Sequence, residues 1–222
     1  MKDAAAPEDP DPPPRIFLLS PASSGGERAR LVFRPEAQFP LALALRTAEG
    51  APLGDVFTFL SGLYFRGKIG YARAFARPPA GVPGVVVITA SEGLVSPESA
   101  VTLDRLRAWA AVPIDAAEPR YRGPLMRDAR LMDGAAGPRC EVVLLGSVAS
   151  GKYVDLLLDV FGTRLLFPSD FVGRGDMSRG GLLLRCTDER RELEYAPVAT
   201  SIRHGARPPR LQPRRRSRTA SG

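Results

Sequence analysis

The chain is poor in the residues that most often build metal centres, disulfides and acyl-transfer sites. Among 222 residues it has one histidine, His204, and two cysteines, Cys140 and Cys186, which form no C-x-x-C pair. This composition argues against a Ser–His–Asp or Cys–His device. We expect two buried reduced thiols, with no metal site and no cofactor, so that any acid–base chemistry falls to Asp, Glu, Tyr or Lys.

Long apolar runs are also missing. No stretch of 18 uncharged apolar residues occurs, so we expect no membrane span and no membrane partner. Residues 1–14, MKDAAAPEDPDPPP, lack the basic start and apolar centre of a secretory signal, which predicts a cytoplasmic protein. The length suits a disordered leader (1–14), one domain (15–200) and a basic disordered tail (201–222), and it says nothing about oligomeric state.

Positive charge is concentrated in the tail. Residues 203–222 contain seven arginines and no acid, among them Arg214, Arg215 and Arg216, whereas residues 1–202 contain 24 basic and 24 acidic residues. Such a tail has too little apolar surface to fold alone. Two interpretations stay open: it contacts nucleic-acid phosphates non-specifically, or it keeps the protein soluble.

Short apolar runs alternate with segments of helical periodicity. We expect buried strands at 15–20, 84–90, 140–146 and 164–168, and a C-terminal β-hairpin within 181–198. Helices are expected at 27–33, 40–46, 55–76 with a break near Gly62 or Gly67, 102–112, 123–132 and 152–162. This alternation predicts an α/β fold, a mostly parallel sheet of about four to six strands with helices on both faces.

Ligands in such sheets bind outside the carboxyl ends of the strands. Four loops leave strands there, at 20–30, 90–99, 146–153 and 168–181. Three of them mix Gly and Ser, which lets backbone N–H groups approach an anion. We expect all four to meet at one cleft, with Ser20 and Ser23 among the ligand-binding residues.

The stretch GSVASGKY, residues 146–153, is one letter away from the phosphate-binding loop G-x-x-x-x-G-K-[ST]. Gly146, Gly151 and Lys152 match it, but Tyr153 stands where the hydroxyl that binds Mg²⁺ belongs. A P-loop phosphotransferase is therefore the least favoured hypothesis. A helix N-terminus with small residues and one lysine still suits a phosphate or carboxylate.

Residues 168–181, PSDFVGRGDMSRGG, are rich in charge and glycine. Arginine grips phosphates and base edges, and a carboxylate can serve as a general base. The candidates are Asp170 and Asp176 for acid–base catalysis, and Arg174, Ser178 and Arg179 for ligand binding. The alternative is a surface turn with internal Asp–Arg pairs.

Two further features have both functional and structural interpretations. Glu92 follows the strand at 84–90 and is either a catalytic acid or base, or a helix-cap partner. Tyr64 and Arg66, in GLYFRGKIGY, either stack on and neutralise nucleotides or belong to a helix whose aromatic residues face the core.

The order of several short motifs resembles the peroxide-stress YaaA-type proteins and a related uncharacterised family of phage- and DNA-associated α/β proteins. The corresponding residues are Ser20, Leu63, Tyr64, Phe65, Arg66, Tyr71, Ala72, Ser91, Gly93, Leu94, Pro97 and the segment 151–153. The resemblance covers roughly residues 15–185. It implies an α/β fold and a role linked to nucleic acid, such as DNA protection or base processing, and it assigns no catalytic residue.

These observations lead to three hypotheses. The first is a nucleotide- or nucleic-acid-binding α/β protein that acts on a nucleobase or a glycosidic bond, with Glu92, Asp170 or Asp176 as acid or base. The second is a non-catalytic stress-response or binding module in which these carboxylates are structural. The third is the phosphotransferase.

Overall fold

The computed structural model describes residues 11–149, 151–203, 205, 206, 208, 209 and 211. Its main feature is a six-stranded sheet in the order β4-β3-β1-β6-β7-β8. The strands are β1 (Arg15–Leu19), β3 (Val85–Ile88), β4 (Leu94–Val95), β6 (Glu141–Leu145), β7 (Leu165–Pro168) and β8 (Tyr195–Pro197). A two-residue pair, β2 (Ala51–Pro52) with β5 (Ala100–Val101), lies apart from it.

The four inner strands are parallel, as the sequence predicts, and the two edge strands run antiparallel to their neighbours. Phe17 of β1 lies between Val85 and Val143, and all three belong to runs of aliphatic or aromatic residues. Strands covered on both faces need such runs because neither face meets water. The sequence pattern and the sheet therefore agree.

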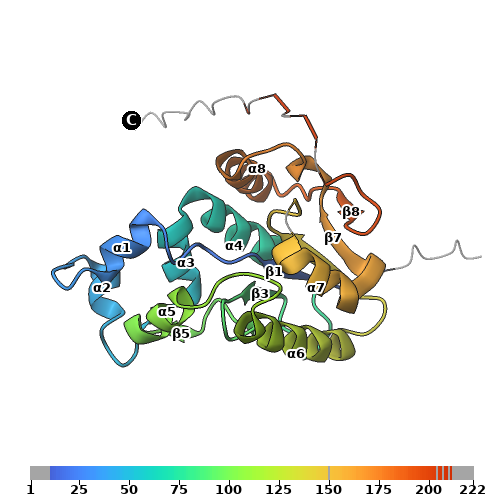
Figure 1. Ribbon diagram of the computed structural model, residues 1–222. Coiled ribbons are helices and arrows are strands. Elements are labelled where there is room, and N and C mark those ends of the chain that lie inside the picture. Colours follow the sequence, from blue (N-terminus) through green and yellow to red (C-terminus); the bar gives the residue numbers. More distant parts are fainter. Residues whose placement is uncertain (1–10, 150, 204, 207, 210, 212–222) are drawn as a thin grey trace, which may run out of the picture.

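Helices cover both faces of the sheet (Figure 1). On one side lie α3 (Leu53–Ser61), α4 (Leu63–Phe75) and α8 (Asp176–Asp188), and on the other α6 (Pro119–Ala136) and α7 (Gly151–Phe161). The shorter helices are α1 (Glu27–Phe33), α2 (Pro40–Ala44) and α5 (Leu103–Ala110), with 3₁₀ turns at Gly162–Arg164 and Ser169–Phe171. None of the helices in the described residues is both long and apolar enough to cross a bilayer.

The predicted break in the segment 55–76 is confirmed at Gly62, whose φ of +61° favours glycine. Helix α4 begins directly after it and packs closely on α8. A Cβ atom added to Gly67 would lie 2.7 Å from the carbonyl oxygen of Gly180, and one added to Gly180 would lie 2.8 Å from the carbonyl oxygen of Leu63. Two glycines thus let the helices approach and bring α4 side chains next to the first turn of α8.

Two local predictions are corrected. The antiparallel C-terminal strand pair is confirmed, but it consists of β7 and β8, and residues 181–188, expected as its first arm, are helical. Burial of Leu182 and Leu183 against the rest of the core overrides their strand-like sequence. The helix expected from Pro124 begins at Pro119, because the Glu118 side chain accepts a hydrogen bond from the Arg120 N–H and caps it.

Candidate functional site

The strand order creates one topological switch point, between β1 and β6. The chain leaves β1 for β3 on one side and leaves β6 for β7 on the other, so the loops after the two strands diverge. A pocket of about 440 Å³ lies at this point. Its polar lining residues are Ser20, Ser23, Ser61, Tyr64, Lys68, Ser147, Lys152, Tyr153 and Asp176. Both the position and the size are those of small-ligand sites in open α/β sheets.

Lys68 of α4 is the buried cation of this pocket, with 1% of its surface exposed. Its ammonium donates to the backbone oxygen of Ser20 at 2.6 Å and to the Ser20 hydroxyl at 2.9 Å. The ring centroids of Tyr64 and Phe65 lie 4.7 and 4.8 Å from Nζ. No carboxylate among the residues that the structure describes pairs with it.

Burial lowers the pKa of Lys68 to about 7, and the negative charge of Asp176 opposes this shift. A lysine removed from water without a carboxylate partner loses the solvation of its charge and therefore binds its proton less tightly. At neutral pH the Lys68 side chain is consequently divided between the ammonium and the neutral amine.

The floor of the pocket is formed where the loops after β1 and β6 touch. The Ser20 N–H donates to the oxygen of Leu145, so Ser20 lies beside Gly146. A Cβ atom on Gly146 would lie 2.7 Å from the Ser20 Cβ and 2.9 Å from the Tyr153 hydroxyl oxygen. Burial raises the pKa of Tyr153, while hydrogen bonding with Ser20 and the Ser147 backbone opposes the shift. Glycine at 146 is thus needed for the Tyr153 hydroxyl to approach Ser20.

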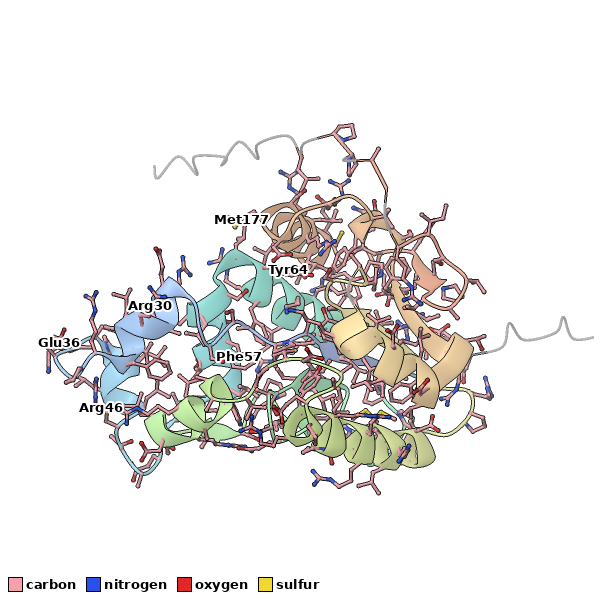
Figure 2. All side chains as sticks on the ribbon, viewed as in Figure 1. Arg30, Glu36, Arg46, Phe57, Tyr64 and Met177 are labelled. Carbon is pink, nitrogen blue, oxygen red and sulfur yellow. The ribbon has the colours of Figure 1, made fainter. Side chains whose placement is uncertain are left out.

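The wall opposite α7 comes from α4 and the first turn of α8. Tyr64 lies inside the molecule where these helices meet (Figure 2). Its hydroxyl is buried without a hydrogen-bond partner among the described residues, and burial raises its pKa although the nearby Arg179 charge opposes this. Arg179 is itself buried and donates to the Phe171 carbonyl oxygen at 3.1 and 3.3 Å. It lies 3.5 Å from the Asp176 carboxylate at the rim.

Six of the sequence-predicted site residues line this pocket. They are Ser20, Ser23, Tyr64, Lys152, Tyr153 and Asp176. Gly146 and Gly151 adjoin it, Gly146 in the floor and Gly151 at the start of α7. Behind the wall, the buried Arg179 donates to the Phe171 carbonyl oxygen and pairs with Asp176 at the rim. Three of the four predicted loops therefore contribute to one site.

The prediction that all four loops meet is wrong for residues 90–99. Both carboxylate oxygens of Glu92 accept from Nε of Arg105 at 3.0 Å, and one also accepts from Trp109 Nε1 at 2.9 Å. Hydrogen bonding from Arg105 holds the pKa of Glu92 below its usual range. Glu92 therefore anchors α5 and lies outside the pocket.

Several other predicted residues lie elsewhere. Arg174 and Ser178 line a separate, smaller cavity of about 290 Å³, beside the exposed Met177 (Figure 2). Arg174 donates to the Asp170 backbone oxygen at 2.9 Å, while Arg66 is exposed on α4 and outside both cavities. Arg214, Arg215 and Arg216 lie outside the described residues.

The sequence places Lys68 in the aromatic and basic segment of residues 62–71, for which nucleotide binding is one interpretation, but Lys68 was not among the predicted site residues. The available signal was its spacing, four residues after Tyr64 on a helix, in a chain with only three lysines. Its burial and its contact with Ser20 depend on how α4 packs over the end of β1, which no local pattern reports.

Comparison with known proteins adds nothing to this geometry, since no family model, no curated protein and no solved structure matches the chain.

Proposed function

We propose that the protein binds a phosphate-bearing nucleotide, free or within nucleic acid, in the pocket between the ends of β1 and β6. The observation that carries this proposal is Lys68, a fully buried cation on the pocket lining that pairs with no carboxylate of the described residues. A bound anion would supply the missing negative charge and raise the pKa of Lys68 back toward its ordinary value.

The rest of the lining supports the same class of ligand. Lys152 lies exposed at the rim, in the first turn of α7, where the helix dipole adds to its positive charge. Serine hydroxyls at 20, 23, 61 and 147 offer further hydrogen bonds. Leu60, Ile114 and the Tyr64 ring supply apolar surface suited to a base or a sugar.

Within this proposal, acid–base chemistry at a nucleobase or glycosidic bond falls to Asp176. It is the one predicted catalytic carboxylate on the pocket lining, because Glu92 is bound to Arg105 and Asp170 lies outside. A DNA-protection or stress-response role would use the same binding site. Asp176 would then favour the charged form of Lys68 through its own negative charge and would not act as an acid or base.

Titrations with sulfate and with dAMP, in which calorimetry measures the affinity, test the binding step. We expect Lys68→Met to weaken both ligands at least tenfold, which corresponds to about 1.4 kcal/mol, and Lys152→Ala to weaken them severalfold. Arg66→Ala is the matched control, since Arg66 is on the same helix but exposed and outside the pocket. Equal affinities in wild type and Lys68→Met would refute the proposal.

A truncation separates the pocket from the tail. Removal of residues 212–222 should leave dAMP affinity unchanged, and retention on immobilised DNA shows which part contacts phosphates of the polymer. If the truncated protein binds neither dAMP nor DNA, the tail and not the pocket is the binding element.

A further inference from the structure

The environment of Lys68 suits a reaction at its amine as well as attraction of an anion. Lysines that act as nucleophiles are removed from water and lack a carboxylate that would hold the proton on nitrogen. Among the residues with a described position, Lys68 meets both conditions, and the two acceptors of its hydrogen bonds are oxygens of Ser20. In the neutral form, N–H bonds to Ser20 leave the nitrogen lone pair available.

The other ionisable groups around Lys68 also leave the amine free. Asp176 influences it only at a distance, being 69% exposed at the rim, and Lys152 is an exposed residue of the pocket lining. Tyr64 and Tyr153 keep their protons because burial raises the pKa of both hydroxyls. The pocket lining therefore has one buried lysine, on α4, and one exposed lysine, on α7.

We propose that Lys68 forms a covalent imine with the aldehyde of a phosphorylated sugar, whose phosphate is held at Lys152. This inference rests on the proposed function and names its ligand class: a pentose phosphate that can open to an aldehyde, either free or as a nucleotide that has lost its base. A glycosidic bond broken at a nucleotide produces such a sugar, so the imine fits a pocket that processes bases.

The step balances without a further reactant. The lone pair of the Lys68 nitrogen forms a bond to the aldehyde carbon, and the carbonyl oxygen takes up one amine proton to give a carbinolamine. The second amine proton then leaves with that oxygen as water while the C=N double bond forms. No electrons enter or leave, and hydrolysis reverses the step.

Reductive trapping on the full chain tests this directly. The protein is incubated with 2-deoxyribose 5-phosphate and sodium cyanoborohydride, which delivers hydride to the imine carbon and fixes it as a secondary amine. The expected product carries one sugar phosphate less one oxygen atom. The lysines of the chain are Lys2, Lys68 and Lys152, and the N-terminal amine is next to Lys2, so peptide mapping distinguishes label on Lys68 from label at Lys152 or at the N-terminus.

We expect at least tenfold more label on Lys68 than on Lys2 or Lys152. Lys152→Ala should slow the labelling, and so should 2-deoxyribose without its phosphate. Arg66→Ala should label as wild type does. An oligonucleotide with an abasic site forms a second arm: preferential trapping of this probe assigns the ligand to nucleic acid, and preferential trapping of the free sugar assigns it to a small metabolite.

The outcomes separate this inference from the proposed function. Equal label on all three lysines, or none on Lys68, while sulfate and dAMP still bind in a Lys68-dependent manner, overturns the imine and leaves the binding site intact. Absence of both trapping and binding overturns both. Because the decisive mapping uses the wild-type chain, it does not depend on whether a Lys68 variant folds.

Discussion

The two ends of strand β1 each hold a buried cation, and their surroundings differ in one respect. At the amino end, Arg15 is 9% exposed and pairs with Glu141 and Glu192. Beyond the carboxyl end, Lys68 is 1% exposed, and within the part of the chain that the structure describes its hydrogen-bond acceptors are the backbone and hydroxyl oxygens of Ser20.

The pKa values of the two cations shift in opposite directions for this reason. Burial lowers the pKa of Arg15, but hydrogen bonds and the charges of Glu141 and Glu192 outweigh it, so that the net shift is upward. Burial lowers the pKa of Lys68 with only a distant carboxylate to oppose it. The compensated buried charge of Arg15 belongs to the scaffold, whereas the uncompensated charge of Lys68 beside a pocket is the basis of the binding site that we propose.

The largest change in stability should come from removing a carboxylate partner of Arg15, the compensated cation. Glu192 accepts from Arg15, Arg77 and Tyr195, so Glu192→Ala leaves two guanidinium groups and a half-buried phenol short of an acceptor. We expect a loss of about 3 kcal/mol in the free energy of unfolding, measured by urea denaturation.

Glu194→Ala serves as the control. In the described residues the backbone oxygen of Glu194 accepts hydrogen bonds from Ser169, and the substitution keeps that oxygen. Sulfate affinity should be unchanged in both variants. A Glu192→Ala protein as stable as wild type would show that the network of Arg15 does not hold the amino end together.

The next largest effect is the change of stability with pH that the titration of Lys68, the uncompensated cation, should produce. The pKa of Lys68 is about 7 in the folded protein, below the ordinary lysine value that holds in the unfolded chain. Between these values the unfolded state binds more protons, so stability rises with pH. The contribution of Lys68 to the free energy of unfolding is constant below about pH 6 and becomes more favourable by about 2 kcal/mol from pH 7 to pH 9.

Lys68→Met removes this titration while keeping the apolar stem. The difference in unfolding free energy between wild type and Lys68→Met should therefore change in favour of wild type as the pH rises from 7 to 9. Groups common to both proteins cancel in the difference. A difference independent of pH would mean that Lys68 keeps an ordinary pKa and that its charge is compensated after all.

The smallest effect is expected at Glu92. Its partly exposed carboxylate is paired with Arg105, and in this it resembles the paired charges around Arg15 more than Lys68, which pairs with no carboxylate of the described residues. Glu92→Gln weakens the bonds to Arg105 and Trp109 and should cost about 1 kcal/mol of stability. Affinity for dAMP and trapping at Lys68 should stay at wild-type levels. A loss of either at unchanged stability would place Glu92 in the site, contrary to its position in the structure.

Much of the fold could be read from local patterns. The aliphatic runs around Phe17, Val86 and Val143 predicted parallel inner strands, and Gly62 predicted a helix break, because strand burial and glycine backbone freedom depend on a few neighbouring residues. Residues 181–188 were misassigned since their leucines suit a strand as well as a helix. The choice was made by contact with α4, which includes the approach of Gly67 to Gly180.

The sequence by itself determined the layered α/β architecture, the scarcity of histidine, cysteine and lysine, and the glycine–serine loops at the strand ends. Only the tertiary structure decided which side chains share a pocket: it joined Ser20, Lys152 and Asp176 and left out Glu92. It also showed that, within the described part of the chain, Arg15 is paired with carboxylates whereas Lys68 is not, a difference that the sequence does not reveal. The physical reason is that the cost of burying a charge depends on which groups surround it in space, and those groups come from distant parts of the chain.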